Sequence, residues 1–410
     1  MKRLILTISC ALALSVSAEA RTWRVDAEAS LQSALSAAAP GDEIRLGRGR
    51  LTLSGPIALT RNDVALRGEG ASQTILSFAN QSGGAPAITI GANGVALRDL
   101  AIADMSGSAV EARDCTGLTI SGISIAWPAD ARSSSPPGGM TQVVSGVVVR
   151  NCANVLIEKS AVSGATHAGI MLTGARNAIL TENQARGNVA GVAIQNSIAV
   201  DLSKNQIDDN VTGVVVVNSP GQPQQDGRDI RIFDNDIARN NNASFTHGDD
   251  RDGALSFGTG ITVIAGRNVH IFNNRFSEHG AAHIFVTAFR GRFEDASYNP
   301  LPQDISIRDN RMGRQGFAAG GALRTFAETG VALPDVLWDG ATTYSAAGAM
   351  PRAAMVRILM RGNSGADGDG APTFLSLGLT AAGMDIEYAQ PDTTLSNTRD
   401  IQEPRPIRLP

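Results

Sequence analysis

The chain has 410 residues, a formal net charge of −4 and only 4% aromatic residues. Its acidic balance argues against a nucleic-acid partner, because phosphate binding needs a basic surface. The 44 glycines suit many short strands joined by tight turns.

The first twenty residues have the layout of a secretory signal peptide. Residues 1–3 (Met-Lys-Arg) are basic, residues 4–16 are apolar, and residues 18–20 (Ala-Glu-Ala) match the small-residue pattern of a cleavage site. The apolar run is too short for a membrane-spanning helix, which takes about 20 residues. We expect cleavage after Ala20 and a location in the periplasm or outside the cell.

The next segment, residues 21–42, contains a predicted short helix. Residues 28–39 have amphipathic spacing, and Pro40 with Gly41 ends the pattern. The role of this helix depends on the repeat that follows it.

A four-residue strand motif recurs through the middle of the chain. Clear copies begin at 146, 169, 191 and 213 (Gly-Val-Val-Val, Gly-Ile-Met-Leu, Gly-Val-Ala-Ile and Gly-Val-Val-Val). Further copies begin at 87, 109, 260 and 283. The shared spacing is 22 or 23 residues, and the two longer gaps fit one repeat plus an inserted loop. Such a period indicates a repeat architecture.

Asparagine dominates a second column, fourteen residues after the head of the motif. Its members are Ser160, Asn183, Asn205 and Asn274 and, once loops 218–229 and 288–303 are allowed for, Asn235 and Asn310. Apolar and polar residues alternate on both sides, which marks strands with one buried face. Asparagine tolerates the left-handed conformation of a tight turn. We predict that these amides stack as an asparagine ladder.

These patterns predict an all-β fold, a single-stranded right-handed parallel β-helix over residues 43–312. Each coil of about 22 residues holds three short strands, and equivalent residues of stacked coils lie about 4.8 Å apart. The ends of such a stack expose strand edges that need caps. We expect residues 21–42 to cap one end, and residues 313–410 to form a mixed cap and an extended tail.

Two cysteines follow residue 20, Cys115 and Cys152, in one column of successive coils. An exported protein meets an oxidising compartment, so a disulfide is allowed. Side chains in one column point the same way, however, so the sequence favours stacked thiols over a disulfide.

Several segments carry a family resemblance. They are Pro-Gly-Asp-Glu-Ile at 40–44, Val-Ala-Leu-Arg-Gly-Glu-Gly at 64–70, the stretches 163–170, 188–192 and 218–221, and Leu-Pro-Asp-Val-Leu-Trp-Asp-Gly at 333–340. The first two resemble the opening coil of the pectin-lyase-like superfamily, and the others resemble bacterial parallel β-helix repeat-containing proteins. The resemblance spans most of the chain after residue 20 and implies the fold. It implies no single reaction, because the superfamily holds lyases, epimerases, polygalacturonases and non-catalytic members.

In catalytic members of that superfamily the substrate lies across the outer face of the first strand of each coil. The alternation predicts these outward residues here: Val148, Arg150, Met171, Thr173, Ala193, Gln195, Val215, Val217, Thr262, Ile264, Phe285 and Thr287. A lyase or epimerase needs a base and a group that neutralises the sugar carboxylate, and a glycosidase needs two carboxyl groups. One cation and no carboxylate on this face argue against catalysis there, and its apolar row favours packing or binding.

The loops beside this face are richer in titratable groups. Candidate catalytic residues are His167 at a strand head, His247, Asp249 and Asp250 in loop 241–259, and Arg290 and Tyr298 in loop 288–303. Candidate substrate-binding residues are Arg150, Gln195, Phe285 and Arg251. Two loops that flank one strand face can wall a groove, with histidine as base, tyrosine as acid and arginine holding a carboxylate. The alternative is that these loops are merely solvated. His270 and His279 are expected on the surface.

No cofactor is expected. The aspartates at 249–252 and 367–369 lack the spacing of a calcium loop, although calcium stays open. Histidine and cysteine form no zinc set. Two functions remain: binding or processing of an acidic polysaccharide, as by a polyuronate lyase or C5-epimerase, or a non-catalytic envelope scaffold or solenoid that binds a glycan or another protein. The sequence leaves enzymatic activity undecided.

Overall fold

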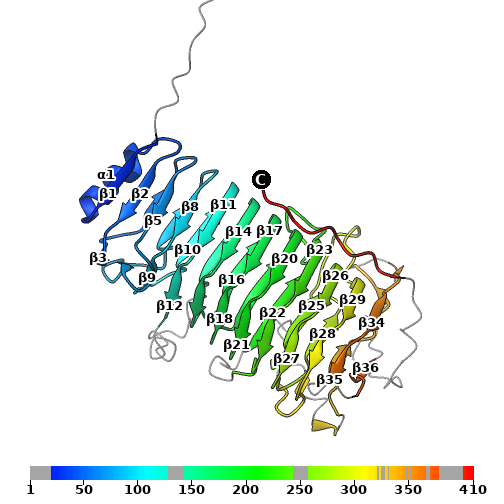
Figure 1. Cartoon of the computed structure of the whole chain (residues 1–410). Coiled ribbons are helices and arrows are strands. Elements are labelled where there is room, and N and C mark those ends of the chain that lie inside the picture. Colours follow the sequence, from blue (N-terminus) through cyan, green and yellow to red (C-terminus); the bar gives the residue numbers. More distant parts are fainter. Residues whose placement is uncertain are drawn as a thin grey trace, which may run out of the picture.

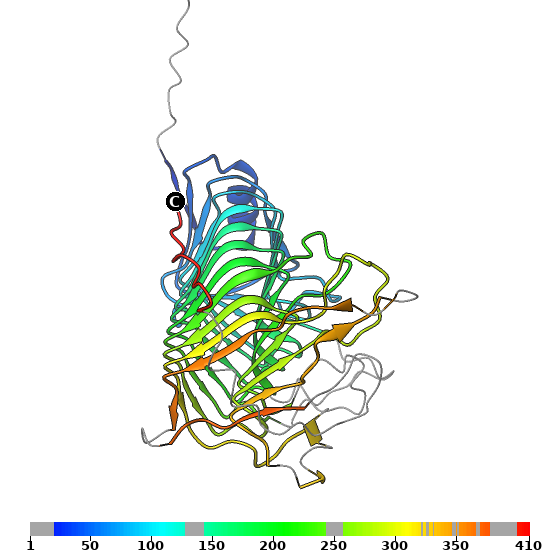
Figure 2. The ribbon, with the colours of Figure 1, turned by 90° about the vertical axis from the view of Figure 1, so that its right-hand side faces the viewer.

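A computed structural model describes residues 20–127, 143–242, 257–320, 323–324, 328–330, 332–346, 350, 352–365, 370–377 and 400–410. These residues form the predicted right-handed parallel β-helix, an elongated stack of coils with helix α1 (Glu28–Ala37) at its N-terminal end (Figure 1). Figure 2, turned by 90°, shows the coils behind one another. Within these residues, no helix is both long enough and apolar enough to cross a membrane.

Three parallel sheets form the sides of the stack, and each coil adds one strand to each of them in the order A, B, C. Sheet A contains β1 (Thr22–Val25), β2 (Glu43–Leu46), β5 (Ala65–Arg67), β8 (Ala96–Arg98), β11 (Thr116–Ser121), β14 (Ala153–Glu158), β17 (Arg176–Thr181), β20 (Ile198–Ser203), β23 (Arg228–Phe233), β26 (Arg267–Phe272), β29 (Gln303–Arg308) and β34 (Ile358–Arg361). Sheet B contains β3 (Gly49–Thr52), β6 (Thr74–Ser77), β9 (Ala101–Ala103), β12 (Ser124–Ala126), β15 (Ala161–Ser163), β18 (Gln184–Arg186), β21 (Gln206–Asp208), β24 (Asp236–Ala238), β27 (Arg275–Ser277), β30 (Arg311–Met312) and β35 (Ser364–Gly365). Sheet C contains β4 (Ile57–Leu59), β7 (Ile88–Ile90), β10 (Val110–Arg113), β13 (Val147–Arg150), β16 (Ala168–Thr173), β19 (Ala190–Gln195), β22 (Thr212–Val217), β25 (Ile261–Ile264), β28 (Ile284–Thr287), β31 (Val336–Trp338) and β36 (Phe374–Ser376). An antiparallel pair, β32 (Thr343–Tyr344) and β33 (Arg352–Ala353), lies outside these sheets.

The inward residues of the strands make one hydrophobic core that runs the length of the stack. It extends from Val25 in β1 to Ile358 in β34. Leu31 and Leu35 of α1 are buried against its first coil, so the helix caps the N-terminal end as predicted. Apolar burial in each coil depends on the coils above and below it, which is typical of a solenoid.

The predicted asparagine ladder is present at the corner between sheets A and B. Each amide nitrogen donates to the Oδ1 of the next coil: Asn183 to Asn205 (3.0 Å), Asn205 to Asn235 (2.9 Å), Asn235 to Asn274 (2.9 Å), Asn274 to Asn310 (3.0 Å) and Asn310 to Asn363 (2.9 Å). The left-handed conformation belongs to the preceding residue, such as Glu182 or Lys204, both with φ of 56°. The turn is therefore made one residue earlier than predicted, and the asparagine bridges the coils.

A second ladder, which was not predicted, lies at the corner between sheets B and C. Asn188 donates to Asn210 (3.0 Å) and Asn210 to Asn240 (2.9 Å), all three of them buried. The Asn240 amide then lies 3.3 Å from the Nε2 of His279, so a histidine takes the place of the next asparagine.

Two further expectations need correction. The stack does not end near Met312, because β31, β34, β35 and β36 continue the three sheets; long insertions between these strands hide the period in the sequence. Cys115 and Cys152 form a disulfide and are not free thiols. Their Cα atoms lie 4.5 Å apart in neighbouring coils, close enough for the two sulfurs to bond.

Candidate functional site

The outer face of sheet C has the alternation that the sequence predicts. One file of outward residues comprises Glu111, Val148, Met171, Ala193, Val215, Thr262 and Phe285, and a parallel file comprises Arg113, Arg150, Thr173, Gln195, Val217, Ile264 and Thr287. Each file rises by one strand per coil, about 4.8 Å. The face is divided into a covered half and an open half.

The covered half consists of the apolar outward residues from β19 onward. Ala193, Val215 and Ile264 are at most 8% exposed and form a cluster against which Phe289 packs. Phe285 is equally buried, in a cluster with Leu323 and other apolar residues of the C-terminal region. Most of the predicted apolar row is therefore a packing surface. Phe285, a candidate substrate contact, is covered by the chain itself.

The open half consists of Glu111 and Arg113 on β10, Arg150 on β13 and Met171 on β16, whereas Val148 beside them is only 4% exposed. Arg113 and Arg150 occupy adjacent coils with side chains 61% and 39% exposed, and both bind Glu111 Oε1, at 2.7 and 3.0 Å. The sequence predicts one cation and no carboxylate on this face. The outward files extend back to β10, which adds a second cation, Arg113, and a carboxylate, Glu111. Two guanidinium groups share one carboxylate, which leaves a positive excess beside the partly exposed Met171.

A polar file continues from Arg150 toward the later coils. The Thr173 hydroxyl lies 3.4 Å from Gln195 Oε1, and Gln195 Nε2 donates to Ser219 Oγ at 3.2 Å. The structure therefore brings two predicted binding residues, Arg150 and Gln195, into one file two coils apart. Arg150 and Gln195 are partly exposed in this file, whereas Thr173 between them is only 8% exposed.

His167 stands at the opposite edge of the face. It directly precedes β16, is half-buried, and its Nδ1 lies 3.1 Å from Ser145 Oγ. Six residues of extended strand separate it from Thr173, the neighbour of Arg150, a distance of about 20 Å. His167 and Arg150 cannot contact the same sugar residue.

Residues of loop 288–302 form hydrogen bonds with residues far from them in the sequence. Tyr298 is 2% exposed, its hydroxyl donates to the Asn218 carbonyl at 2.6 Å, and burial raises its pKa above the usual value. Arg290 Nη2 donates to Asp339 Oδ2 at 2.8 Å, and this carboxylate also accepts from the Thr287 hydroxyl. Tyr298 is thus unsuited to donating a proton to a bound sugar, contrary to its predicted role.

His247, Asp249, Asp250 and Arg251 lie outside the described residues, as do the aspartates at 367–369. Their predicted roles stay predictions. Among the residues that the structure does describe, no three His, Cys, Asp or Glu side chains are grouped to hold a metal ion.

His270 and His279 are buried, contrary to the expectation that they lie on the surface. His279 Nδ1 and His283 Nδ1 lie 2.7 Å apart, and His283 Nε2 lies 3.0 Å from the Gly313 carbonyl. Burial lowers the pKa of both His279 and His283. The sequence does not reveal that His279 is buried, because His279 occupies a ladder position that asparagine fills in the coils before it. A buried pair of this kind cannot serve as a base for a surface ligand.

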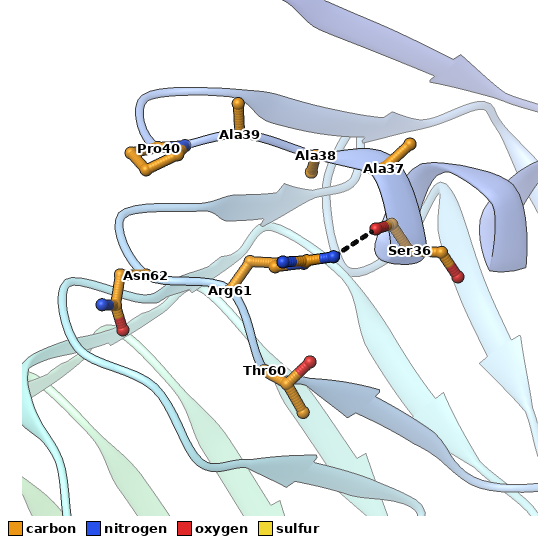
Figure 3. A pocket seen from close by; sticks show the side chains of 8 residues that line it. All are labelled: Ser36, Ala37, Ala38, Ala39, Pro40, Thr60, Arg61 and Asn62. Carbon is orange, nitrogen blue, oxygen red and sulfur yellow. Dashed lines mark hydrogen bonds between the residues drawn. The ribbon is translucent and has the colours of Figure 1, made fainter.

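A hollow on the surface lies at the N-terminal cap, between the end of α1 and residues 60–62 (Figure 3). Arg61 crosses it, and its Nη2 donates to the Ser36 carbonyl at 2.9 Å. A cation at the C-terminal end of a helix satisfies an otherwise unpaired carbonyl and the helix dipole. The hollow is therefore part of the cap and holds no catalytic group.

Comparison with protein families agrees with this geometry. The profile of the right handed beta helix region matches residues 69–226 and 140–296, which together cover more than half of the chain. The chain belongs to the right-handed β-helix family. No curated protein matches the sequence of this family member.

Solved β-helix structures resemble this right-handed β-helix protein at low sequence identity. The catalytic unit of the GH87 α-1,3-glucanase from Streptomyces thermodiastaticus strain HF3-3 is 17% identical, with 91% of this chain and 68% of that chain covered and a TM-score of 0.53. The mannuronan C-5 epimerase AlgE4 A-module of Azotobacter vinelandii is 15% identical (85% and 86% covered, TM-score 0.47). The periplasmic alginate epimerase AlgG is 12% identical (83% of each chain, TM-score 0.49). These likenesses concern the fold.

Proposed function

We propose that this β-helix protein binds an acidic polysaccharide, in the periplasm or outside the cell, along the open half of the sheet C face. The observation that carries the proposal is the pair of exposed guanidinium groups, Arg113 and Arg150, stacked in adjacent coils around one carboxylate. Arginine binds carboxylates through two parallel hydrogen bonds, and it does so better than lysine.

A polymer is favoured over a small ligand because the polar groups form a file. An extended chain along the stack meets the partly exposed Arg150 and Gln195, which lie two coils apart, with the largely buried Thr173 between them. A protein partner, as in a non-catalytic envelope scaffold, is less supported, since the apolar residues of this face are largely covered by the chain itself.

Processing of the same polymer by β-elimination or C5 epimerisation is the second candidate. The observation in its favour is His167, a half-buried histidine beside the same face. Proton abstraction needs a base within hydrogen-bond reach of the sugar. The distance of about 20 Å along the strand direction between His167 and the arginine file makes binding the better-supported role.

Retention on immobilised alginate, pectate and hyaluronate tests the proposal. We expect Arg113→Gln with Arg150→Gln to weaken retention about tenfold, as for the loss of charge-assisted hydrogen bonds. Arg275→Gln with Arg311→Gln, which removes two exposed arginines of adjacent coils on sheet B, is the matched control and should leave retention unchanged. An equal loss in the control, or no retention on any gel, contradicts the proposal.

The same samples decide between binding and processing. Absorbance of unsaturated sugars reports β-elimination, and proton NMR of the polymer reports epimerisation. Retention without either signal supports a binding protein. A signal that is lost in His167→Gln establishes the second candidate.

A further inference from the structure

The C-terminal segment, residues 400–410, crosses the outer face of sheet A as an extended strap (Figure 1, red). Asp400 Oδ1 accepts from Arg361 on β34 at 2.9 Å, at one end of the strap. Toward the other end, the Ile407 amide lies 3.3 Å from Asp201 Oδ2 on β20. The strap thus runs from the last coil back toward the centre of the stack, across the strands.

Glu403 is the central contact of this strap. Its carboxylate accepts from Arg308 Nη2 at 2.5 Å and from Arg231 Nη1 at 3.2 Å. Arg231 and Arg308 lie on β23 and β29, on either side of β26, which places the buried His270 between them. The Glu403 carboxylate therefore bridges Arg231 and Arg308, a pair that we call the Arg231–Arg308 clamp.

Both arginines are held in place by the sheet, independently of the strap. Arg231 makes two bonds to Asp201, Nη2 to Oδ2 at 2.5 Å and Nε to Oδ1 at 2.8 Å, and its side chain is only 7% exposed. The Arg308 guanidinium carbon lies over the Phe272 ring, 4.0 Å from its centroid, and Arg308 Nη1 is 3.1 Å from Asp309 Oδ2. Arginines fixed in this way lose little side-chain entropy when a carboxylate binds.

We infer that the Arg231–Arg308 clamp, with Arg361 in the next coil, is a second binding site for an acidic polysaccharide, which the strap occupies as an internal competitor. The strap presents the carboxylates of Asp400 and Glu403 on an extended backbone, as an acidic polymer presents its own. Three arginines lie under it, Arg231, Arg308 and Arg361, whereas only two carboxylates from outside the strap, Asp201 and Asp309, pair with them. The ligand class rests on the proposed function, whereas the site itself lies on a different sheet.

The test uses the full chain with the strap weakened by Asp400→Asn and Glu403→Gln. The probe is a fluorescent oligogalacturonate, and binding is measured by anisotropy. Apparent affinity is proportional to the fraction of molecules in which the site is unoccupied by the strap. Weakening the strap raises that fraction, so we expect binding about tenfold tighter than in the parent chain. A second variant, Glu403→Lys, repels the clamp and should give the same gain.

Two controls separate this site from the sheet C face. Arg405→Gln with Arg408→Gln changes exposed strap residues and should produce no gain. Arg308→Gln added to the weakened strap should abolish the gain, whereas Arg150→Gln should leave it intact. The inference is overturned if neither strap variant gains affinity, or if the gain survives Arg308→Gln.

Discussion

At Asn205 a single buried amide holds three coils together. Its Nδ2 donates to Asn235 Oδ1 and to the Leu180 carbonyl, at 2.9 and 3.0 Å, and its Oδ1 accepts from the backbone and side-chain nitrogens of Asn183. Water cannot replace these partners, since Asn183, Asn205 and Asn235 are all buried. A residue at this position is therefore constrained by hydrogen bonding as well as by size.

Asn205→Ala is expected to lower the free energy of unfolding by about 2–4 kcal/mol, because it leaves several buried donors and acceptors without partners. Gln206→Ala, the exposed next residue in β21, should change it by less than about 0.5 kcal/mol. Urea unfolding followed by circular dichroism measures both. Equal effects of the two substitutions would mean that the ladder contributes no net stability.

Among the elements, the disulfide joins two consecutive coils at the corner between sheets C and A. Cys115 follows β10 and Cys152 follows β13, with a sequence separation of 37 residues. The bond closes a loop that contains residues 128–142. Closing a loop of this length restricts the unfolded chain, which stabilises the fold by about 4 kcal/mol in the chain-entropy estimate.

Replacing both cysteines by serine should therefore lower the free energy of unfolding by about 2–4 kcal/mol. Serine fits the column, since Ser197 occupies the equivalent corner two coils beyond Cys152. Denaturant titrations with and without reductant measure the effect, and the double variant should be insensitive to the reductant. Two reactive thiols in the denatured, unreduced chain from residue 21 onward would disprove the bond.

The second ladder ends in a pair of histidines that is neutral in the folded chain. Asn240 Nδ2 donates to His279 Nε2, which leaves the His279 Nδ1 proton for His283 and the His283 Nε2 proton for the Gly313 carbonyl. An added proton would break one of these bonds. Among the described residues, the charged group facing the pair is Asp335, whose Oδ1 lies 3.6 Å from His283 Nε2.

This arrangement predicts lower stability in acid. Burial lowers the pKa of both histidines in the folded chain, whereas unfolded histidine titrates near 6.5. Below about pH 6.5 the histidines of the unfolded chain bind protons, whereas those of the folded chain do not. The free energy of unfolding therefore falls as the pH falls. We expect a loss of about 1–3 kcal/mol between pH 7.5 and 5.5, by urea titration.

The substitution His279→Asn distinguishes the contribution of the histidine pair to the pH slope from the contributions of other titrating groups. Asparagine extends the ladder from Asn240 without a titratable ring, so the pH slope should become shallower. Part of the slope should remain, because burial also lowers the pKa of His270. An unchanged slope would show that the pair is not its source.

The strands and the first ladder could be predicted because they recur at a constant spacing of 22 or 23 residues. The second ladder was missed where His279 replaces asparagine. The apolar row on sheet C predicts packing or binding, but the residues that cover it could not be predicted, since Phe289 and Leu323 come from outside the repeat. Contacts between segments far apart in sequence leave no periodic signal, and Tyr298 was assigned to a catalytic role for the same reason.

In the whole molecule, the inward side chains of each coil pack on those of the neighbouring coils and form one continuous core. A terminal coil can open by breaking one interface, whereas a central coil must break two. Hydrogen exchange measured by mass spectrometry should therefore show the slowest amides in β14, β17 and β20, and faster exchange in β2 and β34. The disulfide before β14 and the Ile407 contact on β20 add protection to the centre. Uniform exchange in all coils would instead mean that the stack opens only by global unfolding, with its two ends as stable as its middle.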